Sequence, residues 1–191
     1  MSVNKRIRRS PEEAREHILN AAESRLADLG LDGLTVSGVA GAAGISHANV
    51  VHHFGSTDGM RSALFGRMTK QLLDDVSNAL RAEVPTEEIM KRLFSTLTRP
   101  GHGNLLAWRM LGNVELPDDG GAQDRFASIL ATVAEERPDE ARNLIMLIAA
   151  AAMGISICRE PLQQMIGYSD EELEAFPAWL ANLVHPGDGQ D

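Results

Sequence analysis

Two short helical segments, over residues 34–44 and 46–53, carry the pattern that says most about chemistry. A small side chain at Ala40 lets the two helices approach closely, and Gly44 allows the left-handed backbone of a tight turn between them. Ser46 is placed to cap the second helix, which leaves the amides at its N-terminus free to meet a phosphate or a groove edge of DNA. The pattern therefore predicts a helix-turn-helix whose second helix enters the major groove.

The charge of the chain is divided unevenly, which bears on whether a nucleic acid could be a partner. The net charge is −9 and the pI is about 5.1. Residues 1–67, however, hold 8 Lys+Arg against 7 Asp+Glu, whereas residues 68–191 hold 10 against 20. The first part therefore carries +1 and the second −10, and four of the six histidines also fall in the first part. The overall acidity does not exclude DNA binding by the N-terminal part.

Five blocks of sequence around these segments resemble a known family. In chain order they are Arg15-x-x-Ile18-Leu19-x-Ala21-Ala22, Gly30-x-x-x-Leu34-Thr35-Val36, Val39-Ala40, Ala43-Gly44-Ile45-Ser46 and His53-Phe54-Gly55-Ser56. Their order and spacing, over about residues 12–65, are similar to the N-terminal domain of tetracycline-repressor (TetR) family regulators. The rest of the chain resembles that family in length and in helical character.

The resemblance implies an all-α fold, in which a three-helix helix-turn-helix domain is followed by a larger helical domain for ligand binding and dimerisation. It places a basic arm at 1–9, the DNA-binding domain at 10–56, the effector-binding and dimerisation domain at 57–185 and a tail at 186–191. The implied protein is a homodimer that reads a palindromic operator in double-stranded DNA. We expect a repressor, released by a small apolar effector and needing no cofactor.

The resemblance also assigns DNA-contacting roles to residues of this sequence. Asn49 is the best candidate for reading a base, because its amide can pair with adenine through two hydrogen bonds. His47 can donate to guanine, Ala48 can contact a thymine methyl group, and Thr35 matches a helix cap that touches phosphate. The full predicted set is Arg6, Arg9, Thr35, Ser46, His47, Ala48, Asn49, His52 and Thr57.

Two positions depart from the family pattern. The family has Tyr where this chain has Val51, and Lys where it has Thr57, and both usual residues contact phosphates. Each missing contact is expected to weaken binding at every sequence alike and to flatten its salt dependence. His52, His53 and the basic arm of residues 1–9, with its cations Lys5, Arg6, Arg8 and Arg9, could compensate. The alternative is that the arm is a solvated tail.

Apolar residues recur at intervals of three and four along almost the whole chain, which predicts helices. Ser10-Pro11-Glu12-Glu13 has the form of an N-terminal capping box, and Gly30 is placed to end the helix that it opens. The predicted helices, about nine in all, span residues 10–29, 34–44, 46–53, 56–85, 86–97, 105–114, 123–136, 139–159 and 169–184, with a loop at 117–121.

The composition predicts a soluble cytoplasmic protein. A single cysteine, Cys158, excludes an intrachain disulfide and suits a reducing compartment. The basic N-terminus is followed by glutamates rather than by an apolar stretch, so no secretion signal is expected. The longest nearly unbroken apolar run, 144–157, is below the roughly 20 residues that cross a bilayer, which favours a buried core helix.

Methionines and aromatic residues are scattered through the second part of the chain. Most are expected in the core, but methionines adapt to varied apolar shapes, so a flexible apolar pocket is plausible. Trp108 is the best candidate for its wall and Arg109 for its polar anchor. The predicted ligand-contacting set is Met68, Phe94, Trp108, Arg109, Met110, Phe126 and Met153.

The run at 144–157 is apolar on all sides, so one face must pack within its own chain while another needs a partner. Together with the amphipathic last helix it suits a four-helix dimer interface, the arrangement usual in the family. The predicted interface residues are Met146, Ala150, Met153, Ile157, Phe176, Trp179 and Leu183. The alternative is that the run forms an intrachain core and that the dimer uses a different surface.

Catalysis and metal binding find little support in the sequence. Gly101-His-Gly103 lacks the third glycine and the preceding strand of a dinucleotide site, and Cys158 is expected to be a small buried side chain rather than a nucleophile. Adjacent histidines such as His52 and His53 point about 100° apart on a helix, which does not suit a shared metal. Two rivals stay open: a helical ligand-binding protein with weakened DNA contacts, and an enzyme that uses Cys158 or His102.

Overall fold

The structure is a computed structural model that describes residues 10–112 and 121–185. The predicted basic arm with Arg6 and Arg9, most of the predicted loop at 117–121 and the predicted tail lie outside the described residues.

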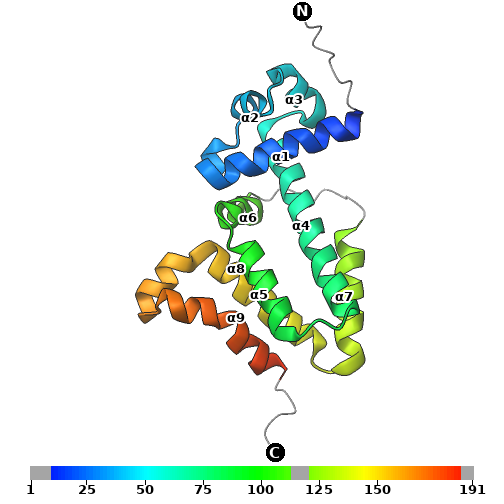
Figure 1. The fold of residues 1–191 in the computed structure, drawn as a ribbon, viewed down its shortest axis with the longest axis vertical. Coiled ribbons are helices and arrows are strands. Elements are labelled where there is room, and N and C mark those ends of the chain that lie inside the picture. Colours follow the sequence, from blue (N-terminus) through cyan, green and yellow to red (C-terminus); the bar gives the residue numbers. More distant parts are fainter. Residues whose placement is uncertain (1–9, 113–120, 186–191) are drawn as a thin grey trace, which may run out of the picture. The chain divides into compact units, whose positions relative to one another are not determined.

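Nine α-helices and one short 3₁₀ helix account for the secondary structure of the described residues, and these residues contain no strand. The predicted all-α fold class is confirmed. The elements, labelled in Figure 1, are α1 (Pro11–Leu29), η1 (Leu31–Gly33), α2 (Val36–Ala43), α3 (His47–Phe54), α4 (Thr57–Arg81), α5 (Thr86–Leu97), α6 (His102–Leu111), α7 (Ala122–Glu136), α8 (Ala141–Ile166) and α9 (Asp170–Val184).

The chain divides into two compact units, residues 1–64 and 65–191. The N-terminal unit contains α1, η1, α2, α3 and the beginning of α4, and the C-terminal unit contains the rest of α4 and all the later helices. α4 is therefore one continuous helix whose residues belong to both units.

Local capping explains where the first helices begin and end. The Ser10 hydroxyl accepts from the Glu13 amide at 3.1 Å, and the Glu13 carboxylate accepts from the Ser10 amide at 2.7 Å, which forms the predicted capping box. Gly30 ends α1 with φ of 64°, in the left-handed region that favours glycine. Thr35 caps α2 by accepting from the Gly38 amide at 3.1 Å.

The N-terminal unit has its own apolar core, to which each of its helices contributes. α3 contributes Val50, and the first turns of α4 contribute Met60 and Leu64, all fully buried. The other buried core side chains, from α1, α2 and the segment between them, are Ile18, Leu19, Ala22, Leu26, Leu34, Val36, Val39, Ala40 and Ala43. The unit can therefore hold the helix-turn-helix in place without help from bound ligands or metals.

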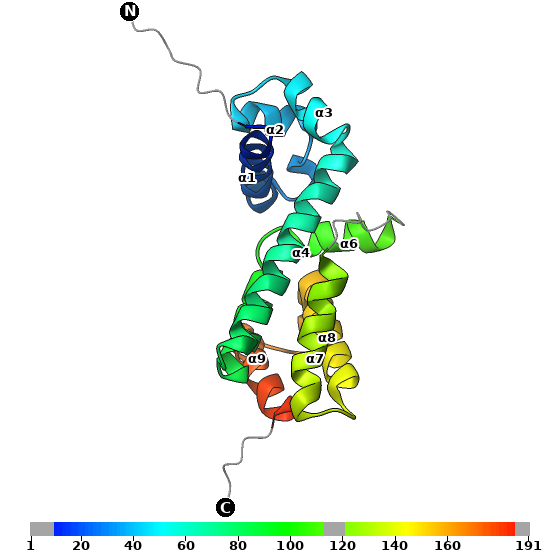
Figure 2. The ribbon, with the colours of Figure 1, turned by 90° about the vertical axis from the view of Figure 1, so that its right-hand side faces the viewer.

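The C-terminal unit is built around α5, α8 and α9. α5 packs on both α8 and α9, and α7 runs alongside α8 (Figure 2). Phe94 of α5 meets Phe176 of α9 edge-on with ring centroids 5.7 Å apart. The buried centre of this cluster consists of Met90, Phe94, Ala152, Leu180, Ala181 and Val184.

α8 is longer than the sequence predicts. The sequence predicts that this helix ends near residue 159. The structure instead kinks at Cys158, where φ is −120° and ψ is 26°, and continues to Ile166. Pro161 then lies in the first turn of the segment after the kink, where its missing amide leaves no internal hydrogen bond unmade.

Two expectations about α8 are wrong in the single chain. Cys158, expected to be buried, is exposed and lies at the kink of the helix. The helix as a whole, expected in the core, has only 11% of its most apolar 18-residue window buried. By length and composition α8 could span a membrane, which for a single helix is weak evidence. The exposed apolar face of α8 agrees with the separate expectation that one face of the apolar run at 144–157 needs a partner.

An ion pair joins α4 to α7 within the C-terminal unit. The Arg125 guanidinium donates to the Asp74 carboxylate, and the Lys70 ammonium lies 3.8 Å from the same carboxylate. The hydrogen bond from Arg125 lowers the pKa of Asp74 below its ordinary 3.8, and the two nearby positive charges act in the same direction. The ionised carboxylate therefore stabilises the fold.

We expect Asp74→Asn to lower the melting temperature slightly at pH 7, since the Asp74 side chain is 41% exposed and water screens the pair. A depressed pKa means that the stabilisation is present above pH 3.8 and is lost as the pH falls through the lower, folded-state value. Melting temperatures of the wild type and the variant, measured from pH 7 to pH 3, should converge at the acid end. A difference that does not change with pH would contradict this role for Asp74.

Candidate DNA-binding site

The start of α3 is capped and turned toward solvent. The Ser46 hydroxyl accepts from the Asn49 amide at 3.3 Å, which confirms Ser46 as the N-cap. His47, Ala48 and Asn49 are exposed, as are Val51 and His52 further along the helix, whereas Val50 is fully buried. The three residues predicted to read bases therefore lie together at the accessible end of a short helix, as the predicted role requires.

The turn between α2 and α3 has the geometry that the sequence pattern predicts. Gly44 has φ of 65° and ψ of 32°, a left-handed conformation that strains residues with a Cβ. The Ile45 amide donates to the Ala40 carbonyl at 3.0 Å, which satisfies one of the last carbonyls of α2. A short turn of this kind holds the start of α3 at a fixed distance from the end of α2.

Two side chains of α1 hold the ends of the helix-turn-helix. Arg15 donates to the carbonyl of His53, near the end of α3, at 2.9 Å, and its guanidinium lies 4.4 Å from the centre of the Phe54 ring. The Nε2 atom of His17 donates to the carbonyl of Ala43, the last residue of α2, at 2.8 Å. α1 therefore contacts the last turn of both helices through directional bonds.

The other predicted DNA contacts lie around this helix pair. The exposed Thr35 caps α2, and Thr57 begins α4 half-buried. Val51, which stands where the family has Tyr, is 37% exposed and offers no polar group. His53 lies beside Phe54 with ring centroids 6.3 Å apart.

The residues predicted to bind an effector are not gathered around one described cavity. Phe94 lines a small cavity of about 370 Å³ between α5, α8 and α9. Arg109 is buried, with its guanidinium 5.9 Å from the centre of the Phe65 ring, and Trp108 is half-buried beside it on α6. Met68 and Met153 are also half-buried, whereas Met110 and Phe126 are exposed.

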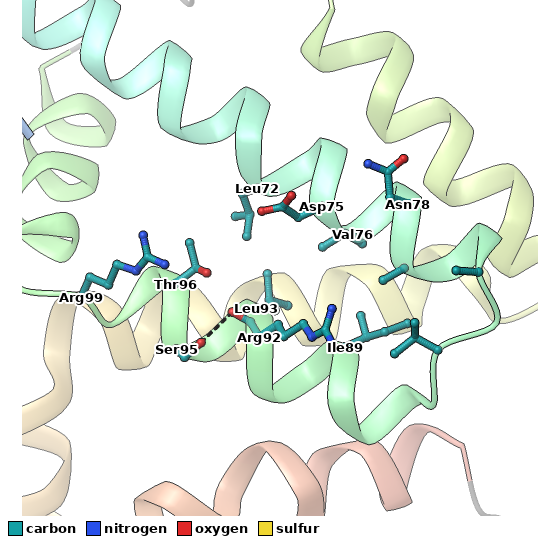
Figure 3. Close-up of a pocket in the computed structure, with 13 residues that line it drawn as sticks. Leu72, Asp75, Val76, Asn78, Ile89, Arg92, Leu93, Ser95, Thr96 and Arg99 are labelled. Carbon is teal, nitrogen blue, oxygen red and sulfur yellow. Dashed lines mark hydrogen bonds between the residues drawn. The ribbon is translucent and has the colours of Figure 1, made fainter. Parts of the chain in front are cut away.

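Three larger concave surfaces lie in the C-terminal unit. The first, the α4–α5 groove, has a volume of about 530 Å³. Figure 3 shows Leu72 and Asp75 on its α4 side, with Arg92 and Arg99 on its α5 side. The dashed line there is the hydrogen bond that the Ser95 hydroxyl donates to the Arg92 carbonyl at 3.0 Å. Its charged side chains thus have both signs.

The other two surfaces have apolar floors. The α8–α9 groove has a volume of about 430 Å³ and is lined mainly by Ala150, Ala151, Gly154, Ile155, Leu162, Ile166, Phe176 and Trp179. The turn-end pocket, of about 580 Å³, lies where the α4–α5 turn, the end of α7, the first half of α8 and the end of α9 meet.

The predicted dimer residues lie on and beside the α8–α9 groove. Of the thirteen exposed large hydrophobic side chains in the described part of the chain, eight belong to α8 or α9. They include four predicted interface residues, Met146, Ile157, Trp179 and Leu183, of which Met146 is 69% and Trp179 57% exposed. Ala150 is also exposed, and Met153 and Phe176 are half-buried. The single chain therefore leaves a concentrated apolar surface in contact with water.

Comparison with known proteins identifies the N-terminal unit. Residues 18–64 match the family model of the bacterial regulatory proteins, tetR family. The N-terminal unit thus matches the TetR-family helix-turn-helix domain. The match covers the second half of α1, both helices of the helix-turn-helix and the start of α4.

Solved structures extend the likeness in fold to nearly the whole chain. A transcriptional regulator of Streptomyces coelicolor, SCO4942, matches with a TM-score of 0.63 and 21% identity, over 91% of this chain and 97% of that one. The fatty acid degradation regulator FadR of Bacillus halodurans matches with a TM-score of 0.61 and 15% identity, over 96% of this chain and 100% of that one. FadR of Bacillus subtilis, solved with stearoyl-CoA, matches with a TM-score of 0.57 and 15% identity, over 88% of this chain and 96% of that one. No curated protein matches. The chain thus has the fold of a TetR-family transcriptional regulator.

Sequence reasoning missed the two α1 contacts in this TetR-family domain. Arg15 belongs to one of the motif blocks, but its partner is a backbone carbonyl 38 residues away, and His17 bonds a carbonyl 26 residues away. Every residue has a backbone carbonyl, so the residue types in the sequence do not indicate which carbonyl Arg15 or His17 will bond. Arg15 therefore holds the end of α3, and His17 holds the end of α2.

We expect Arg15→Met to lower the affinity for DNA about tenfold or more, because a hydrogen bond from a charged donor to the end of α3 is lost. The slope of the logarithm of the binding constant against the logarithm of salt concentration should stay unchanged, since Arg15 acts through α3. A slope that falls by about one would show instead that Arg15 contacts a phosphate. Arg142→Met, which removes an exposed arginine from α8, is the matched control.

Proposed function

We propose that this protein is a ligand-responsive transcriptional repressor, which binds a palindromic operator as a homodimer and is released by a small apolar effector. The observation that carries the proposal is the capped, exposed start of α3 in a TetR-family DNA-binding domain. A helix presented in this way can place its first residues against base edges in the major groove.

The DNA contact proposed for each residue of α3 follows from the chemistry of its side chain. Asn49 pairs with adenine through the two groups of its amide, His47 donates to guanine, and Ala48 contacts a thymine methyl group. Ser46 and Thr35 cap the N-termini of α3 and α2, and the backbone amides at these helix starts can donate to DNA phosphates. Arg6 and Arg9, together with His52, supply phosphate contacts in place of those that the family's Tyr and Lys make at the positions of Val51 and Thr57.

The homodimer is proposed on the exposed apolar surface of α8 and α9. A monomer rarely leaves so large an apolar patch in water, and small residues along α8 such as Ala150 and Gly154 allow a second helix to approach closely. A twofold axis through this surface would pair two copies of the same patch. The two recognition helices can then read half-sites separated by about 34–36 Å, one turn of DNA.

The effector and its action are proposed from the C-terminal unit. The α8–α9 groove and the turn-end pocket have apolar floors, and the Bacillus subtilis FadR structure with stearoyl-CoA supports the idea that this fold can accept a ligand with a long apolar chain. Release follows by linkage if the effector binds more tightly to a dimer arrangement whose recognition helices do not match the operator. α4, whose residues belong to both units, is the continuous element through which such a change can act.

The test of the proposal is selection of bound sequences from a random duplex pool at about 50 mM and about 200 mM salt. We expect a palindrome to be enriched, and Asn49→Ala to relax the base preference at one position in each half-site. Unchanged specificity in that variant would remove Asn49 from base reading.

Failure to enrich any sequence at the lower salt would favour the second candidate function, a helical small-molecule-binding protein whose DNA contacts have weakened. The exposed apolar side chain of Val51 is the observation that keeps this candidate open. Val51→Tyr combined with Thr57→Lys would then be expected to restore binding.

Trp179→Glu with Met146→Glu should convert the proposed dimer to a monomer, because each dimer would bury four carboxylates in an apolar interface. Sedimentation velocity measures the change directly. Leu111→Glu, at an exposed apolar residue of α6, is the matched control and should leave the dimer intact. A dimer that survives the double substitution would place the interface elsewhere.

A further inference from the structure

The turn-end pocket combines a deep apolar floor with a charged rim. Five helices contribute to it, and its floor is continuous with the core cluster of the C-terminal unit through Met90, Ala181 and Val184. The remaining apolar lining is Leu80, Val84, Pro85, Ile89, Val133, Leu144, Ile145 and Ile148. At about 580 Å³, the pocket falls within the size range of small-molecule sites.

The charges on its rim do not cancel. Glu87 pairs with Lys91 at 2.5 Å, and Arg137 is engaged by Glu140 and by the carbonyl of Val184. The remaining charged groups are Glu83 and Glu136. Glu136 lies 3.7 Å from His185, which pairs with it only when the imidazole is protonated, and Glu83 has no ion-pair partner among the described residues. The rim therefore carries uncompensated negative charge.

The surroundings of the pocket have the same sign. Residues 68–191 carry 20 acidic against 10 basic residues, so the field of this unit attracts cations and repels anions. The α4–α5 groove differs, because Arg99 lies on its wall as well as Asp75, and its other arginine, Arg92, is paired with Glu88 at 2.9 Å. The α8–α9 groove has an apolar floor but no Asp or Glu in its lining, whereas the turn-end pocket combines an apolar floor with an acidic rim.

We propose that the turn-end pocket binds a small apolar organic cation, with the apolar body on the floor and the cationic group between Glu83 and Glu136. An anion of the same size, such as a fatty carboxylate, would fit the floor but meet repulsion at the rim. The inference deepens the proposed function by naming the chemical class of the effector, and it rests on that function for its effect on DNA.

Calorimetric titration of the full chain with decyltrimethylammonium and with decanoate tests the charge preference. At about 50 mM salt and pH 8 we expect the cation to bind about tenfold more tightly, and we expect the difference to shrink at about 500 mM salt because the rim is open to water. Lengthening the alkyl chain should raise affinity by about fourfold per methylene group, the increment for a CH₂ removed from water. Equal binding of the two probes, or no binding of either, would overturn the proposal.

Substitutions on the rim locate the site. Glu83→Gln and Glu136→Gln should each weaken binding of decyltrimethylammonium, whereas Glu135→Gln, which removes the same charge from the neighbouring exposed position outside the pocket, should not. Glu136→Lys should shift the preference toward decanoate. If all four variants bind the cation like the wild type, the ligand lies elsewhere and the assignment fails.

The backbone conformation of Glu83 allows one variant to distinguish a binding role of this residue from a structural role. Glu83 has φ of 51°, the left-handed conformation in which glycine is usual, and it lies at the end of α4, where the Val84 amide donates to the Ala79 carbonyl at 3.0 Å. Glu83→Gly should therefore leave the melting temperature unchanged or raise it while weakening cation binding. Weaker binding accompanied by a lower melting temperature would assign Glu83 to the fold instead.

The titrations contain no DNA, so their outcome is independent of the operator selection. A palindrome recovered without any cation binding would leave the repressor proposal intact and overturn the ligand class alone. Cation binding without any enriched sequence would do the reverse. Where both succeed, decyltrimethylammonium should release the selected operator and decanoate should not.

Discussion

The orientation of α3 depends on bonds that other helices make to it. α3 has eight residues and buries one side chain, Val50, whereas an isolated helix of fewer than about 12 residues is marginal in water. Its N-terminal end is held by the turn at Gly44 and its C-terminal end by Arg15 of α1. These contacts do not involve the side chains of His47, Ala48 and Asn49, which therefore stay exposed while the helix is held at both ends.

The sequence predicts those features of the N-terminal unit that depend on residues no more than four positions apart. The caps at Ser10, Thr35 and Ser46, and the turn glycine Gly44, occur where their residue types indicate, because each interacts with backbone three or four positions away or sets its own φ. The contacts of Arg15 span 38 residues and become visible only when α1 and α3 are packed together.

In the C-terminal unit the sequence predicts helices better than their ends or their cavities. The helix predicted to end at residue 159 continues to Ile166, because a kink at Cys158 lets a new helical segment begin just before Pro161. Methionine and aromatic residues indicate apolar surroundings, but the packing of five helices decides which of them line a cavity. The effector residues predicted by type, such as Met110 and Phe126, are therefore dispersed, while Glu83 and Glu136 gave no sequence signal.

The charge of the chain is concentrated in its C-terminal part. The acidic C-terminal part is repelled by the phosphates of DNA, so the nearly neutral N-terminal part is the one that can approach a duplex. The same acidity raises the local concentration of cations around the turn-end pocket. Under the proposed function, the C-terminal part therefore repels a DNA duplex that the helix-turn-helix does not repel, and it attracts a small cation. An anionic effector would have to overcome the same field before it reached the turn-end pocket.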